Sequence, residues 1–209
     1  MSRLPLFTDE TLIAPEVTQL HGFVDTRPLL DAIGEISRRA PLRHLQTRGG
    51  GTMSVAMTNC GPWGWHSDAR GYRYVAQDPL SGHPWPALPP IFLELAQRAA
   101  QRGGFPGFEP DACLINRYAT GAQMGAHRDF DELDMRHPIV SVSIGVAATF
   151  LWHGASRGGS PLRVTVEDGD VVVWGGAARG GYHGVRKLEA ASHPLTGALR
   201  YNLTFRRAK

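Results

Sequence analysis

Residues 139–144 read Ile-Val-Ser-Val-Ser-Ile, a β-branched run in which serine alternates with valine. The surrounding stretch from His137 to Ser156 carries no Asp, Glu, Lys or Arg, so by length alone it would also suit a membrane-spanning helix. Polar alternation argues for strands instead, because side chains two residues apart in a strand point to the same face. We therefore predict two core strands here and no membrane association.

Short runs of the same kind, bounded by turn residues, recur over the second half of the chain. They cover residues 112–118, 139–144, 148–152, 162–166, 170–174 and 199–205. Their spacing of roughly ten residues favours a sandwich or jelly roll over βαβ units. Residues 167–170, Glu-Asp-Gly-Asp, predict a hairpin between the fourth and fifth of these runs.

Two earlier segments, residues 27–40 and 90–102, have the apolar spacing of amphipathic helices and are suited to cover a sheet. Between them, residues 46–89 are rich in glycine, proline and aromatic side chains but show little periodicity. Such a segment predicts either a functional lid or short irregular strands, and residues 52–57 are a candidate strand.

Composition limits the remaining organisation. The chain has 209 residues with 25 glycines and 15 prolines, which suits one mainly β (α+β) domain over residues 1–209. Its net charge of +3 permits a polyanionic partner without requiring one. Cys60 and Cys113 cannot form a disulfide framework, and the first ten residues lack the apolar run of a secretion signal. We expect reduced thiols in a cytoplasmic monomer.

The sequence His127-Arg128-Asp129 places an imidazole and a carboxylate two residues apart, so in an extended segment both face the same way. This pair is two-thirds of a facial metal site, and His183, next to Gly184, can supply the third ligand. Three open coordination positions then suit Fe(II) with a co-substrate and O₂. The alternative is a surface turn, and His66-Ser67-Asp68 is a second pair of the same form.

The segment from Arg200 to Arg206 alternates in character, with Arg, Asn, Thr and Arg at the even positions. One interpretation is a half-buried strand whose polar face meets water. In the other, the polar face lines the protein interior, where Arg200 and Arg206 bind a dicarboxylate through their guanidinium groups. An iron site beside two arginines suits 2-oxoglutarate-dependent oxygenation.

These elements occur in the order and spacing of a known family. The chain carries Asn116-Arg117-Tyr118, then His127-x-Asp129-x-Asp131-Glu132, His183, and Arg200-Tyr201-Asn202-Leu203-Thr204-Phe205-Arg206. Residues 53–61, 111–116 and 169–176 carry the likeness as well. From about residue 40 onward the sequence therefore resembles the AlkB family of DNA-alkylation repair dioxygenases, whereas residues 1–26 carry little of it.

The resemblance implies a double-stranded β-helix (jelly roll) with supporting helices, in which residues 112–209 form the catalytic core and residues 46–89 an N-terminal nucleotide-recognition lid. It implies that His127, Asp129 and His183 bind Fe(II). It also implies a 2-oxoglutarate site made by five residues: Asn116, Tyr118, Arg200, Asn202 and Arg206.

For the substrate, the resemblance implies a flipped base stacked on Trp65 and a phosphate held by Tyr72. Asp131, which we count among the catalytic residues, and Glu132 beside it are implied to contact the damaged base, with Arg157 near its edge. A carboxylate close to the iron attracts a base that alkylation has made cationic and disfavours a neutral one. Phe130 departs from the polar or basic residue that the family pattern leads us to expect there.

The implied activity is oxidative demethylation of 1-methyladenine- and 3-methylcytosine-type bases in single- or double-stranded DNA, single strands preferred. Its products are formaldehyde, succinate and CO₂. An unpaired, damaged base is also the cheapest to extrude from a duplex. Two alternatives stay open at this point: an oxygenase of the same fold that acts mainly on RNA, and a non-catalytic metal-binding jelly roll that recognises nucleic acid.

Overall fold

The computed structural model describes residues 9–209. The expectation of no secretion signal rests on the first ten residues, and residues 1–8 of these lie outside the described range. The main element is an eight-stranded antiparallel sheet with the order β1-β2-β12-β9-β14-β7-β4-β3. The strands of this large sheet are β1 (Glu10–Ala14), β2 (Val17–Leu20), β3 (Arg43–Gln46), β4 (Thr52–Cys60), β7 (Ala112–Tyr118), β9 (Ile139–Gly145), β12 (Val171–Trp174) and β14 (Arg200–Arg206).

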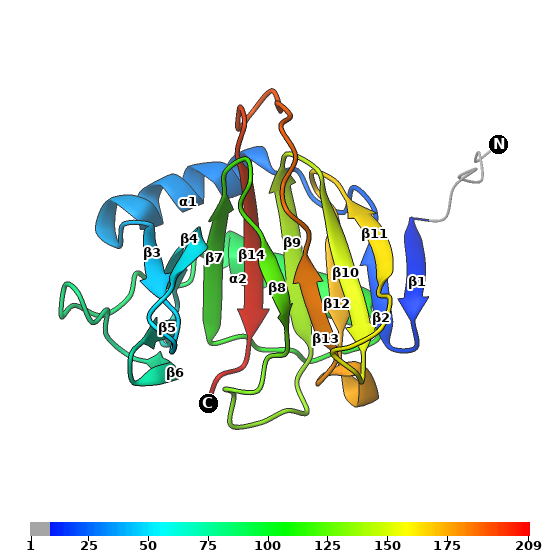
Figure 1. Ribbon diagram of the computed structural model, residues 1–209, viewed down its shortest axis with the longest axis horizontal. Helices are drawn as coiled ribbons and strands as arrows, with labels where there is room; N and C mark the ends of the chain where they lie inside the picture. The colour runs from blue at the N-terminus through cyan, green and yellow to red at the C-terminus, as the bar shows by residue number, and fades with distance from the viewer. Residues whose placement is uncertain (1–8) are drawn as a thin grey trace.

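A second antiparallel sheet of four strands, with the order β11-β10-β13-β8, lies in front of the large sheet in Figure 1. The strands of this small sheet are β8 (Met124–His127), β10 (Ala148–Gly154), β11 (Leu162–Val166) and β13 (Tyr182–Val185). The two facing sheets form the jelly roll that the strand spacing predicts. The fold class is therefore confirmed.

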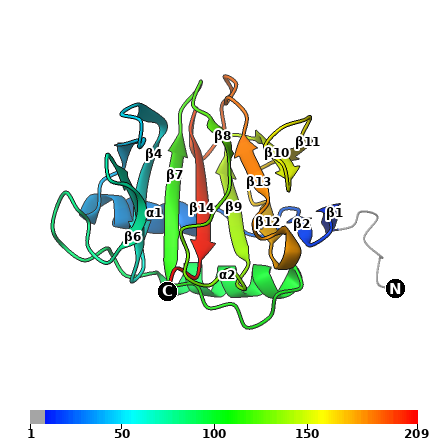
Figure 2. The same ribbon diagram turned by 60° about the horizontal axis from the view of Figure 1, so that its bottom comes forward.

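Two α-helices lie on the other face of the large sheet, α1 (Arg27–Arg39) and α2 (Pro90–Arg102); in Figure 2 α1 runs behind the strands and α2 crosses near their lower ends. Both carry a proline in the first turn, where its missing N–H has no helical partner to lose. Leu29 and Ile33 of α1 and Phe92 and Leu95 of α2 are buried against the sheet. Both predicted helices are confirmed. A short 3₁₀ helix, η1 (Gly176–Ala178), follows β12.

All six strands predicted beyond residue 112 are present, but the hairpin predicted at residues 167–170 is wrong. β11 pairs with β10, whereas β12 pairs with β2 and β9, so these four residues carry the chain from one sheet to the other. The Asp170 carboxylate accepts hydrogen bonds from Gln19 Nε2 (2.8 Å) and from the Gly22 backbone N–H (2.9 Å). These contacts tie the turn to the large sheet, and a hairpin would not make them.

The predicted lid, residues 46–89, is divided in the structure. β4 is a long strand of the large sheet, while β5 (Gly64–Asp68) and β6 (Gly71–Val75) form a separate two-stranded hairpin, seen at the left of Figure 1. Strands β1 to β4 also extend the large sheet beyond the predicted core of residues 112–209. Within residues 46–89, the β5–β6 hairpin and the connection after it belong to neither of the two facing sheets.

The remaining fold expectations concern the cysteines and the uncharged stretch. Cys60 and Cys113 are buried free thiols directly opposite each other on β4 and β7. The uncharged stretch forms β9 and β10, as predicted. Among the described residues, neither helix has the length and hydropathy needed to cross a bilayer.

Candidate active site

The even-numbered residues of β14, from Arg200 to Arg206, line a cavity between the two sheets and are all buried. The odd-numbered residues Leu203 and Phe205 point the other way, into the core under the helices. The interpretation of a water-facing polar strand is therefore wrong. Strand register places matching polar residues beside β14: Asn116 and Tyr118 from β7, and Ser141 and Ser143 from β9.

Arg200 is 2% exposed and is only partly satisfied by the protein. Its Nη2 donates a hydrogen bond to Ser143 Oγ (3.1 Å), but Nε and Nη1 have no protein partner. Burial lowers the pKa of Arg200 and raises the pKa of the neighbouring Tyr118 to about 12. A buried cation with two free donors fits an anionic ligand such as a carboxylate, because buried polar groups are otherwise hydrogen-bonded.

Asn202 holds the middle of the same cavity in place. Its Nδ2 donates to Ser141 Oγ (2.8 Å) and to the Val142 carbonyl (2.9 Å). Its Oδ1 accepts from Thr204 Oγ1 (2.8 Å) and Asn116 Nδ2 (3.3 Å). These bonds fix the side chains before any ligand arrives, while Asn116 Oδ1 keeps no partner.

Strand pairing in the small sheet brings two distant histidines together. His127 at the end of β8 lies directly opposite His183 on β13, and the ring centroids are 4.4 Å apart. Gly184 permits this approach, since a Cβ there would lie 2.7 Å from the Met124 carbonyl oxygen of β8.

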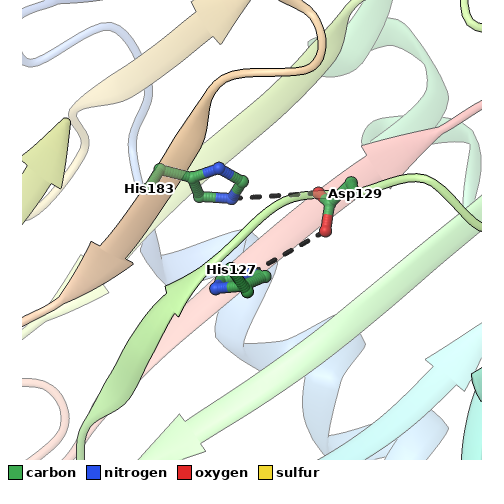
Figure 3. Close-up of side chains that lie close together, drawn as sticks. All are labelled: His127, Asp129 and His183. Atoms are coloured by element: carbon green, nitrogen blue, oxygen red, sulfur yellow. Dashed lines mark ion pairs between the residues drawn. The ribbon is translucent and has the colours of Figure 1, made fainter. Parts of the chain in front are cut away.

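Asp129 completes a cluster of three (Figure 3). Its Oδ1 lies 3.8 Å from His127 Nε2, and its Oδ2 lies 3.9 Å from His183 Nε2. Each imidazole places Nδ1 near a backbone carbonyl, that of Gly125 (2.9 Å) or Gly181 (3.0 Å). With the proton on Nδ1, both Nε2 lone pairs face the carboxylate, as a metal site requires. Within residues 9–209 this is the one cluster of ligand-type side chains that could hold a metal ion.

The charges around this cluster keep the imidazole neutral and the carboxyl ionised. Burial lowers the pKa of His183 to about 3, and the nearby His127 adds to the effect. Burial opposes ionisation of Asp129, but Arg206 and the two histidines outweigh it and hold the pKa of that carboxyl well below its usual range. Burial alone would lower the pKa of Arg206, whereas Asp129 and its other acidic neighbours raise it. A divalent cation therefore meets His183 neutral and Asp129 ionised at pH 7, so neither needs to lose a proton to bind it.

A second cavity adjoins the first at His127 and Arg206 and opens toward the β5–β6 hairpin. Trp65 and Tyr72 of this hairpin are stacked, with ring centroids 5.4 Å apart and planes 26° apart. Trp65 Nε1 donates a hydrogen bond to Asp131 Oδ2 (2.8 Å). Aromatic faces beside a carboxylate suit a flat, positively charged ligand, because the ring faces attract cations.

The structure separates the residues expected at the substrate. Trp65, Tyr72 and Asp131 line the second cavity. Glu132 does not, because it is 7% exposed and its carboxylate points into a buried network, so the expected contact with a base is not what the structure shows. Arg157 lies in the exposed connection between β10 and β11, outside both cavities.

At position 130 a phenylalanine stands where a polar or basic residue was expected, and it contacts a neighbouring arginine. Its ring is 51% exposed and lies 4.2 Å from the Arg128 guanidinium, which also faces the Tyr182 ring at 5.1 Å. Arg128 lines the second cavity. A positive charge is thus present at position 128, where two aromatic rings contact the guanidinium.

Several site residues were missed by the sequence analysis. Ser141 and Ser143 carried a usable signal, because their alternation in β9 mirrors that of β14. Tyr74 and Arg179 carried none, since nothing in a single sequence indicates their contacts with the segment around Asp129. Trp174, whose ring centroid is 4.8 Å from that of His183, appeared only as part of a core strand.

Comparison with known proteins agrees with this geometry. The family model described as the 2OG-Fe(II) oxygenase superfamily matches residues 16–206. "Alpha-ketoglutarate-dependent dioxygenase AlkB" of Salmonella typhimurium is 50% identical over 211 residues, 98% of each chain, and the protein of the same description from Escherichia coli is 53% identical over 187 residues, 90% of this chain and 87% of the relative. The solved structure of OsALKBH1 superposes with a TM-score of 0.83 at 27% identity, covering 95% of this chain and 99% of that one.

The chain therefore belongs to the 2OG-Fe(II) oxygenase superfamily. Within that superfamily it is a member of the AlkB family. It is accordingly a dioxygenase that uses Fe(II), 2-oxoglutarate and O₂, which decides against a non-catalytic metal-binding module. The His-Asp-His cluster and the free donors of Arg200 fit these cofactors.

Proposed function

We propose that this dioxygenase demethylates N-alkylated nucleobases of the 1-methyladenine and 3-methylcytosine type in DNA, with single strands preferred. The observation that carries the proposal is the position of the Trp65–Tyr72 stack and Asp131 beside the candidate metal cluster. The same proposal has the protein act as a monomer in the cytoplasm.

His127, Asp129 and His183 are the proposed iron ligands, since their ligand atoms lie within 4.8 Å of one another. Arg200 offers Nε and Nη1 to one carboxylate of 2-oxoglutarate, while Asn116, Tyr118, Asn202 and Arg206 line the rest of that cavity. When bound, Fe(II), 2-oxoglutarate and O₂ supply hydroxylation of the N-methyl carbon, with 2-oxoglutarate converted to succinate and CO₂.

The second cavity orients the damaged base. Stacking on Trp65 contributes roughly 1–3 kcal/mol per base whatever the sequence. The carboxylate of Asp131 favours a base that carries a positive charge after alkylation, so discrimination against unmodified bases comes partly from electrostatics. Tyr72 is 47% exposed, which supports its proposed role as a hydrogen-bond donor to a backbone phosphate. The hydroxylated methyl group leaves as formaldehyde, and the base nitrogen regains its unmodified form.

Single-strand preference follows from the cost of extrusion. A base must leave its stack to enter the cavity between Trp65 and His127, and this costs least where no pairing partner is lost. The Arg128 guanidinium at the rim supports backbone binding without reading the sequence.

The test uses 1-methyladenine in matched single-stranded DNA, duplex DNA and RNA, with Fe(II), 2-oxoglutarate and O₂ present. We expect one formaldehyde per succinate and the fastest reaction on single-stranded DNA. Equal rates on RNA would remove the preference for DNA. Succinate without formaldehyde on every substrate would refute nucleobase demethylation while leaving the dioxygenase activity in place.

A further inference from the structure

A buried row of alternating charges stands behind Asp129. Arg206 donates from Nε (2.9 Å) and Nη2 (2.6 Å) to Asp129 Oδ2. Arg179 donates from Nη1 to the Asp129 backbone carbonyl (3.0 Å) and from Nε to the His137 carbonyl (2.8 Å). The two arginines thus hold the side chain and the main chain of the same residue, and both are at least nine-tenths buried.

Glu132 lies between these two arginines. Its Oε2 is 3.0 Å from Arg179 Nη2, and its Oε1 is 3.4 Å from Arg206 Nε. Asp129 and Glu132 together balance the two guanidinium charges. Removing one partner from such a set leaves a buried charge uncompensated, which is costly in a site closed to water. Glu132 therefore controls how firmly both arginines hold Asp129.

The β5–β6 hairpin reaches the same loop at two consecutive residues. Tyr74 Oη donates to Glu132 Oε1 (2.7 Å), and Trp65 Nε1 donates to Asp131 Oδ2 (2.8 Å). Trp65 and Tyr74 are directly opposite each other on β5 and β6, so their side chains lie on the same face of the hairpin. The cross-strand pair of Trp65 and Tyr74 thus binds the loop after Asp129, at its second and third residues.

We propose that Glu132 and Tyr74 are positioning residues of the iron site. Glu132 orients Arg206 and Arg179 on Asp129, and Tyr74 ties this assembly to the hairpin that carries Trp65 and Tyr72. Asp129 and the aromatic slot formed by Trp65 and Tyr72 are then held at a fixed distance from each other. The methyl carbon of the substrate therefore reaches the iron at the distance that the reaction requires. The inference depends on the metal cluster and is independent of which base or nucleic acid is the substrate.

The test compares three variants of the full chain, Glu132→Gln, Tyr74→Phe and the control Asp78→Asn. Asp78 is also buried and also pairs with an arginine, Arg43 Nη1 at 2.6 Å, but it lies outside both cavities and the network. Asp78→Asn therefore reproduces the loss of a buried charge without touching the metal loop. Circular dichroism establishes whether each variant folds. If Glu132→Gln does not fold, Tyr74→Phe provides the test.

The first readout is the affinity for Mn(II), which resists oxidation by O₂ and accepts the same nitrogen and oxygen ligands. Loss of an outer-sphere partner typically weakens metal binding about 10- to 100-fold, so we expect about tenfold for Glu132→Gln and less for Tyr74→Phe. Asp78→Asn should stay within about twofold. Unchanged affinity in Glu132→Gln, or an equal loss in Asp78→Asn, would overturn the positioning role.

The second readout is backbone amide exchange with Mn(II) and 2-oxoglutarate added. In the wild-type chain we expect slower exchange in residues 127–132 and also in β6. Tyr74→Phe should keep the first effect and lose the second, because the phenyl ring packs as before but donates nothing to Glu132. If Mn(II) and 2-oxoglutarate did not slow amide exchange in β6 of the wild-type chain, the proposed link between the hairpin and the iron site would be refuted.

Discussion

The pattern His-x-Asp occurs twice in this chain, as His66-Ser67-Asp68 on β5 and as His127-Arg128-Asp129 at the end of β8. In both places the imidazole Nε2 lies near the carboxylate, at 3.6 Å in the first pair and 3.8 Å in the second. What differs is the residue across the strand pair. His127 lies opposite His183 on β13, whereas His66 lies opposite Arg73 on β6.

The residue opposite each histidine decides whether the His-x-Asp pair can bind a metal. Arg73 donates from Nη1 (2.8 Å) and Nη2 (2.7 Å) to the two oxygens of Asp68, which leaves no carboxylate free for a metal. At the other pair, Asp129 faces a second neutral imidazole, and Arg206 binds just one of its oxygens. A three-residue pattern is therefore a weak signal until strand register supplies its third member.

The largest difference between the two His-x-Asp pairs is expected when the aspartate of each pair is replaced with alanine. Asp129→Ala should lower succinate formation from 2-oxoglutarate by more than about a hundredfold, since it removes a ligand and not merely an outer-sphere partner. Asp68→Ala should remain within about twofold. An active Asp129→Ala enzyme would contradict the assignment of the iron ligands.

Two arginines give a second contrast. Arg200 has two free donors in the first cavity, whereas both Nη atoms of Arg73 are bound to Asp68. A hydrogen bond to a charged group is worth about 1.5–3 kcal/mol, so Arg200→Met should raise the KM for 2-oxoglutarate roughly 10- to 100-fold. Steady-state kinetics should show no such rise for Arg73→Met. An unchanged KM in Arg200→Met would place the dicarboxylate elsewhere.

Asp131 tests whether a carboxylate near the metal pair senses substrate charge. Asp131→Asn keeps an oxygen to accept from Trp65 Nε1 but loses the negative charge. The ratio of kcat/KM for cationic 1-methyladenine to that for neutral 1-methylguanine should fall about tenfold, which corresponds to about 1.4 kcal/mol. Asp68→Asn is the matched control and should leave the ratio unchanged. A constant ratio in Asp131→Asn would assign selectivity to shape alone.

The smallest expected effect concerns pH and the non-metal pair. Burial lowers the pKa of His66 below its ordinary value of 6.5, with Asp68 acting in the opposite direction. Below pH 6.5 the unfolded chain therefore binds this proton more readily than the folded chain, so His66 lowers stability as the pH falls and costs nothing above it.

Urea unfolding of the wild-type chain and of His66→Phe, at pH 7.5 and pH 5.5, measures this contribution. The midpoint of His66→Phe should fall less on acidification than that of the wild-type chain. The same loss in both proteins would show that His66 is not the group responsible.

The sequence predicted the large strands and the polar face of β14 because alternation is a local property. It also placed Arg200 and Asn202 at one site, since a single strand carries both. It did not show β8 or β13, which are four residues long and contain glycine, so neither has room for a pattern. Their register, which brings His127 to His183, depends on the packing of the whole jelly roll.

Neighbouring residues with the same chemistry were the hardest to assign. Asp131 and Glu132 are adjacent carboxylates, and the resemblance to the AlkB family implied a contact with the substrate for both. In the structure Asp131 lines the second cavity beside Trp65, whereas Glu132 lies in the buried charge row between Arg179 and Arg206. The arginine that separates their roles, Arg179, comes from a part of the chain that no local motif marks.

The two cavities draw on different parts of the architecture. Most of the polar residues that line the first cavity come from β7, β9 and β14, three neighbouring strands of one sheet. The second cavity is completed by the β5–β6 hairpin and the loop after β8, which bind each other through the hydrogen bonds Trp65–Asp131 and Tyr74–Glu132. Over evolutionary time, changes at hairpin residues other than Tyr74 can therefore reshape the second cavity while the first cavity is inherited intact.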